Sequence, residues 1–93
     1  MPMLSITHSD WQVLRAAKRA KKPPVGRSLR LNPTRGTKDG GFLNRLVRAG
    51  LLSRTSGTDK DPFLATYRIT ELGRYAAEYG EADINWNAYT KGT

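Results

Sequence analysis

Three polar side chains, Asn44, Arg45 and Arg48, are spaced to lie on one side of a short helix. An amide and two guanidinium groups supply hydrogen-bond donors and positive charge, so this side is suited to a polar or anionic partner. The opposite side carries four apolar residues at spacings of three and four: Phe42, Leu43, Leu46 and Val47. We therefore expect a helix that is anchored through one face and leaves a basic face for a partner.

The start of this helix contains two glycines. Thr37 and Asp39 are both good helix caps, so either can begin the helix, which should end at residue 49 before Gly50. Gly40 and Gly41 then fall in the first turn, where each costs ~1 kcal/mol relative to alanine. Such glycines would permit close approach of the backbone to a phosphate or to a neighbouring helix.

A hairpin is predicted directly after the helix. Residues 52–55 and 64–69 are rich in β-branched, aromatic and alternating residues, which is typical of strands. Ala65, Tyr67 and Ile69 should share the inward face of the second strand. The connecting residues 56–62 are all turn-forming types, and their number predicts a projecting, mobile flap rather than a tight turn.

The chain before residue 37 is expected to form one helix and a less regular segment. Thr7 or Ser9 can cap a helix over residues 10–21, which Pro23 and Pro24 would stop because proline cannot donate an N–H. Residues 26–31 fit a short helix or, almost as well, an extended segment. Residues 1–7 should form a short arm from which apolar side chains can pack back on the core.

The last predicted helix begins at Thr70 and ends near Gly80. Its apolar side is expected to consist of Leu72, Tyr75, Ala76 and Tyr79. The tail, residues 81–93, contains Ile84, Trp86 and Tyr89. Large aromatic side chains of this kind are expected to pack on the domain or on a second copy of the chain.

Positive charge is concentrated in the first part of the chain. Residues 1–54 contain twelve Lys or Arg and two acids, whereas residues 55–93 contain four Lys or Arg and six acids. Such asymmetry is typical of proteins that bind a polyanion, because neutralising phosphates releases counterions. A solvated basic surface or a general affinity for RNA would give the same pattern.

Other chemistry has little support in the sequence. His8 is the only histidine, and although Ser5, Ser9 and Asp10 lie near it, groups so close at a helix start are better explained as caps than as a hydrolase triad. Cysteine is absent, and no metal-ligand cluster, P-loop or dinucleotide fingerprint occurs. We expect no enzyme activity, no metal and no cofactor.

Length and hydropathy predict one small soluble domain. A chain of 93 residues can bury only somewhat over ~60% of its extended surface, which allows a single core. The first residues, MPMLSITHSDW, lack the basic start and the apolar run of a signal peptide, and no apolar run reaches the ~18 residues of a membrane span. A cytoplasmic protein is expected, associated with the nucleoid if the host is a bacterium.

The succession LVRAGLLSR, a turn-rich loop and then YRITELGR resembles the second half of a winged helix-turn-helix domain. Bacterial regulators of the multiple-antibiotic-resistance (MarR), PadR and ArsR types share this order of recognition helix, leucine-rich exit, wing hairpin and Thr-capped helix. The resemblance implies an α+β winged helix over residues 1–80, with a three-helix core, a two-stranded wing and a C-terminal helix, followed by the tail 81–93.

The resemblance also implies sites. Five positions at the start of the recognition helix would face the major groove of double-stranded DNA: Thr37, Lys38, Gly41, Asn44 and Arg45. Arg48 would meet a phosphate, Lys60 would lie at the wing tip, and Arg54 and Arg68 would flank it on the wing strands. Three arginines of the preceding segment complete the expected basic surface: Arg27, Arg30 and Arg35.

The function that the resemblance implies is sequence-specific binding of double-stranded DNA by a small transcriptional regulator. Adenine pairs well with Asn and guanine with Arg, at ~1–3 kcal/mol of discrimination for each pair. A homodimer through the last helix and the Trp86 and Tyr89 tail is expected. The alternatives are a winged-helix module that grips an acidic protein, and an RNA-binding protein.

Overall fold

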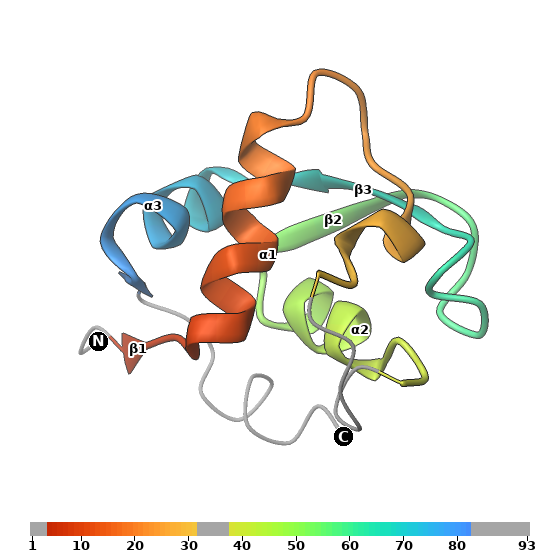
Figure 1. Cartoon of the computed structure of the whole chain (residues 1–93), viewed down its shortest axis with the longest axis horizontal. Coiled ribbons are helices and arrows are strands. Elements are labelled where there is room, and N and C mark those ends of the chain that lie inside the picture. Colours follow the sequence, from red (N-terminus) through yellow and green to blue (C-terminus); the bar gives the residue numbers. More distant parts are fainter. Residues whose placement is uncertain (1–3, 32–37, 83–93) are drawn as a thin grey trace.

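The computed structural model describes residues 4–31 and 38–82 of the chain. The order of elements is β1 (Leu4–Ser5), α1 (His8–Arg19), the 3-10 helix η1 (Gly26–Leu29), α2 (Gly41–Arg48), β2 (Leu52–Ser56), β3 (Thr66–Ile69), α3 (Glu71–Tyr79) and β4 (Glu81–Ala82) (Figure 1). Within the described residues, three α-helices surround an antiparallel hairpin formed by β2 and β3. The predicted α+β class is confirmed. No helix in this part of the chain is long and apolar enough to cross a membrane.

Two threonines cap helices as predicted. The Thr7 hydroxyl accepts a hydrogen bond from the Asp10 N–H at 3.2 Å, and the Thr70 hydroxyl accepts one from the Gly73 N–H at 2.9 Å. Each bond satisfies a backbone donor that has no partner inside its helix. At the other end of α3, Gly80 adopts a left-handed φ of 74° and closes the helix.

The segment between α1 and α2 first pairs with β3 and then forms a short helix, which is the first of the two conformations predicted for residues 26–31. α1 ends at Arg19, two residues earlier than expected, and the chain is already extended at Ala20. Residues 24–25 lie beside β3, where the Tyr67 N–H donates to the Pro24 carbonyl oxygen at 2.9 Å. Residues 26–29 then form η1. The hairpin therefore gains a short third pairing partner from the N-terminal half of the chain.

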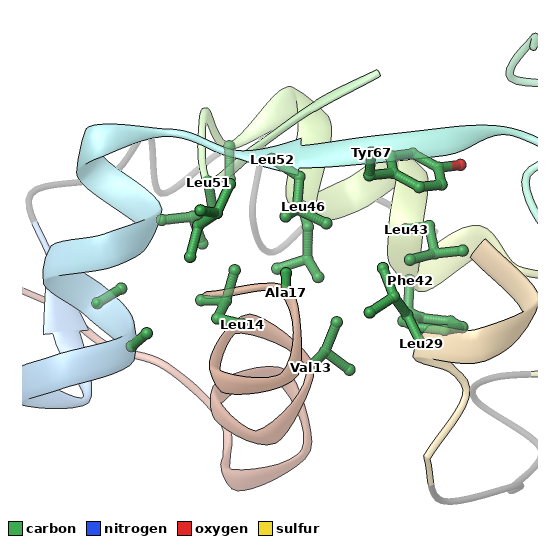
Figure 2. Packing of buried hydrophobic residues seen from close by; sticks show 14 of the residues in the cluster. Val13, Leu14, Ala17, Leu29, Phe42, Leu43, Leu46, Leu51, Leu52 and Tyr67 are labelled. Atoms are coloured by element: carbon green, nitrogen blue, oxygen red, sulfur yellow. The ribbon is translucent and has the colours of Figure 1, made fainter. Parts of the chain in front are cut away.

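The core lies between α1, α2, the hairpin and α3 (Figure 2). From α2 it receives Phe42, Leu43 and Leu46, which are buried, and Val47 packs against its edge. The predicted apolar face of this helix is confirmed. β3 alternates as predicted, with Tyr67 pointing inward.

The packed face of α3 differs from the prediction. Its buried residues are Gly73, Ala76 and Ala77, whereas Tyr75 is 39% and Tyr79 60% exposed. A Cβ at Gly73 would lie 2.1 Å from the Leu51 carbonyl oxygen, so the helix packs through its smallest residues. Small side chains permit a closer approach than the aromatic side does, and the two tyrosine rings instead contact each other at 4.6 Å between centroids.

The two ends of the described fold pair with each other. β1 and β4 are antiparallel, with Leu4 opposite Ala82, and the Ile6 N–H donates to the Gly80 carbonyl oxygen at 3.0 Å. Within the described part of the expected arm, residues 4–5 form a strand and Ile6 is half-buried against the core. The predicted packing of Ile84, Trp86 and Tyr89 falls outside the described residues.

Candidate nucleic-acid interface

α2 begins at Gly41, later than either predicted start, because Gly40 performs a structural role. Gly40 has a φ of 77°, in the left-handed region that glycine adopts most readily. A Cβ at this position would lie 2.5 Å from Cγ of Pro62, in the loop that joins β2 to β3. The Asp39 carboxylate accepts from the Gly41 N–H at 3.0 Å. The first glycine therefore allows close contact with this loop, in place of the predicted phosphate or helix.

Asn44 is bound within the molecule on both sides of its amide. Its Nδ2 donates to the Asp59 carbonyl oxygen at 2.9 Å, and its Oδ1 accepts from Nη2 of Arg54 at 2.7 Å. These contacts connect α2 to the loop and to β2. The expectation that this amide is left for a partner is corrected, because reading a base would require breaking contacts already made.

Arg45 is likewise engaged, by a carboxylate of α1. Its Nη2 lies 2.9 Å from both carboxylate oxygens of Asp10, whose side chain is only 2% exposed, whereas that of Arg45 is 24% exposed. A buried carboxylate without a counter-charge carries a large desolvation penalty. Arg45 thus holds α2 against α1, which corrects the expectation that its guanidinium faces a partner.

The loop between the hairpin strands is fastened rather than projecting freely. Besides the bond from Asn44 to Asp59, the Tyr67 hydroxyl donates to the Pro62 carbonyl oxygen at 2.9 Å, and Pro62 is buried. Burial raises the pKa of the Tyr67 phenol above its usual 10.0, although the nearby Arg54 acts in the opposite direction. The predicted flap is therefore corrected to a loop that folds back toward the start of α2.

The basic side chains expected around α2 and the loop differ in exposure. Besides Arg68, which is exposed on β3, four are exposed to solvent: Arg27, Lys38, Arg48 and Lys60. Arg30 and Arg54 are half-buried, and their guanidinium carbons lie 5.9 Å and 6.0 Å from the ring centroids of Phe63 and Tyr67. Thr37 and Arg35 lie outside the described residues. We call the four exposed cations, with α2 and the loop 57–65, the helix–loop face.

Acids reduce the charge of this face. Asp39, Asp59 and Asp61 are exposed beside these cations in sequence, on the approach to α2 and in the loop. The face is therefore positive but mixed. A more concentrated cluster lies elsewhere, where Lys21, Lys22, Arg68 and Arg74 line a groove at the end of α1.

Only part of this second cluster can be recognised from the sequence. Lys21 and Lys22 stand out as a basic helix end, which can equally complement the helix dipole. Arg68 and Arg74 are isolated charges more than 40 positions further on, and nothing in their spacing shows that they converge with the lysines.

In the described part of the chain, no group of three His, Cys, Asp or Glu is placed to hold a metal ion. Comparison of the chain with protein-family models, with curated proteins and with solved structures gives no match. The assignment of function therefore depends on the geometry and charge described above.

Proposed function

We propose that this protein binds double-stranded DNA through a winged-helix domain, with α2 as the recognition helix and β2–β3 as the wing. The order of α1, η1, α2 and hairpin supports the proposal, as does the pairing of residues 24–25 with β3. The observation that carries it is the placement of exposed Lys38, just before α2, and exposed Arg48, at the end of α2, on either side of Asn44, which bonds to the loop that holds exposed Lys60.

The contacts made by this face are chiefly to phosphates. Because Asn44 and Arg45 are bound internally, the exposed cations supply charge without a free amide to pair with adenine. Phosphate contacts give affinity and position, while base contacts give sequence preference. The proposed regulator thus gains most of its affinity from the DNA backbone, with a modest sequence preference.

The test is the salt dependence of binding to a random-sequence duplex, measured by fluorescence anisotropy. Each phosphate contact changes the slope of log K against log salt by ~0.9, so Lys38→Gln with Arg48→Gln should flatten the slope by about two. Lys18→Gln with Arg19→Gln removes the same charge from the exposed side of α1 and is the matched control. Equal slopes for the two double variants would refute the helix–loop face, and no binding even at low salt would refute DNA as the ligand.

One observation favours a second candidate, a module that grips an acidic protein. Asn44 and Arg45, two groups that are suited to reading bases, are bound within the fold. The basic surface that remains would suit an acidic protein as well as a nucleic acid. Absence of duplex binding, together with a salt-sensitive complex with an acidic polypeptide such as polyglutamate, would favour it. Stronger competition by duplex or structured RNA than by DNA would instead identify RNA as the ligand.

Regulation would be tested by selecting bound sequences from a random duplex pool. A palindromic consensus would support a two-fold assembly, for which the exposed Tyr75 and Tyr79 pair of α3 is the proposed contact. Recovery of unrelated sequences would support DNA binding without a regulatory site.

A further inference from the structure

A groove of about 190 Å³ opens where the end of α1 meets β3 and α3. At ~30 Å³ for each water molecule, this volume holds about six waters, which is room for a phosphate group. Four of its described lining residues are cations, Lys21, Lys22, Arg68 and Arg74, and none is an acid. The loop that carries the two lysines lies at one side of the molecule and α2 at the other (Figure 1).

Proline creates the opening. The Gly26 N–H donates to the Ala65 carbonyl oxygen, and the Tyr67 N–H donates to the Pro24 carbonyl oxygen, so this segment pairs with β3 up to Pro24. Pro24 has no N–H to return a bond to β3, and Pro23 has none either. The chain therefore leaves the strand at this point, and the space beside the end of β3 becomes the groove.

The side chains of the four cations form no ion pair within the described part of the chain. None of the four side chains makes a hydrogen bond or ion pair with another described residue, and all four residues are exposed. Like charges that converge repel one another, and an anion that binds between them relieves this repulsion. Arg is well suited to the task because its guanidinium can donate two parallel hydrogen bonds to phosphate oxygens.

We propose that this groove is a phosphate-binding site, separate from the helix–loop face. Arg68 and Arg74 would donate hydrogen bonds to the phosphate oxygens, and Lys21 and Lys22 would add charge from the opposite wall. The phosphate belongs either to a small phosphorylated molecule or to a nucleic-acid backbone. The site does not depend on the proposed function, because its geometry involves neither α2 nor the loop 57–65.

The first arm of the test measures the thermal unfolding midpoint, Tm, of the full chain against increasing pyrophosphate at constant ionic strength set with NaCl. A ligand that binds only the folded state raises Tm as its concentration passes the Kd. Arg68→Gln with Arg74→Gln should weaken the affinity for pyrophosphate by at least about tenfold, since each removed contact is a charge-assisted hydrogen bond. Lys38→Gln with Arg48→Gln loses the same charge on the other face and should keep the wild-type response.

Two outcomes would overturn the proposal. One is a Tm that does not respond to pyrophosphate in the wild-type chain, which would leave the lysines as partners of the helix dipole alone. The other is an equal response in both double variants, which would mean that pyrophosphate acts through overall charge. If the groove variant proves less stable in NaCl, isothermal titration calorimetry at a temperature where it is folded gives the same comparison.

The second arm identifies the source of the phosphate. If it is a nucleic-acid backbone, Arg68→Gln with Arg74→Gln should flatten the salt slope of duplex binding by up to about two, and pyrophosphate should compete with duplex for the groove. If it is a small phosphorylated molecule, the pyrophosphate response should be lost in this variant while duplex binding keeps its slope. Failure of duplex binding altogether would refute the proposed function and leave the pyrophosphate result standing.

Discussion

The helix–loop face and the groove at the end of α1 differ in whether their polar side chains have partners inside the fold. On the first, Asn44 and Arg45 are committed to partners inside the fold, on Asp59, Arg54 and Asp10. In the groove, Lys21, Lys22, Arg68 and Arg74 meet with no partner among the described residues. The sequence alone does not distinguish a cation that is bound within the fold from a cation that is available to a ligand. The packing of the folded chain makes this distinction.

The largest expected effect concerns the committed arginine. Arg45→Ala should lower the free energy of unfolding by about 2–4 kcal/mol, because it leaves the buried Asp10 carboxylate without its counter-charge; the partial exposure of Arg45 places the loss below that of a fully buried pair. Urea denaturation measures the change. Lys38→Ala, at an exposed position just before the same helix, is the control and should cost well under ~1 kcal/mol.

A double-mutant cycle sharpens this result. In an Asp10→Ala background there is no buried carboxylate to strand, so the further change Arg45→Ala should cost much less than it does in the wild type. Additive effects of the two substitutions on the free energy of unfolding would show that the ion pair contributes nothing to stability. Arg45 would then not differ from the groove cations in this respect.

The next effect concerns the joint between α2 and the loop. Gly40→Ala should destabilise by about 1–3 kcal/mol, because alanine is strained at positive φ and its Cβ would overlap Pro62. Gly41→Ala, one position later, meets only the Asp39 side chain at 3.2 Å and should be neutral or stabilising, since alanine favours the helix. Equal losses at the two glycines in thermal unfolding would contradict the assigned contact.

A smaller loss is expected when the loop is released. Asn44→Ala removes the bonds to Asp59 and Arg54 and should cost about 1–2 kcal/mol. Limited proteolysis should then cut residues 56–61 faster than in the wild type, because the loop loses a tether. Unchanged cleavage at this loop, with the same drop in stability, would show that Asn44 supports α2 alone.

The smallest effect is expected in the groove. Arg68→Gln should change the free energy of unfolding by no more than ~0.5 kcal/mol, because the guanidinium has no partner to lose among the described residues. At low salt the sign should favour stabilisation, since the variant reduces repulsion among the remaining cations. A loss above ~1 kcal/mol by urea denaturation would show that Arg68 belongs to the fold as Arg45 does.

Local chemistry made much of the fold predictable. Thr7 and Thr70 cap helices because a short side-chain oxygen reaches a free N–H, a rule that acts over three residues. The apolar spacing of α2 and the alternation of β3 also follow from local geometry. Features that depend on interactions between residues a few positions apart can be predicted from the sequence without a structure.

What could not be predicted depends on contacts between distant segments. Asp10 and Arg45 are 35 positions apart, and nothing near either one identifies the other as its partner. The Gly73 contact with the Leu51 backbone determines which side of α3 is buried, against the expectation from its tyrosines. The internal contacts of Asn44 and Arg45, two residues of the site expected on α2, could not be predicted for the same reason, because their partners lie on other elements of the fold.

The pairing of β1 with β4 has a mechanical consequence. Leu4 lies opposite Ala82 at the outer end of this ladder, and Ser5 lies opposite Glu81 one step further in. A force that pulls residues 4 and 82 apart would load these hydrogen bonds one after another, as in a zipper, before any stress reached α1 or α3. The β1–β4 pair would therefore separate first, and the helices, the hairpin and both basic surfaces would keep their arrangement while this pair opened.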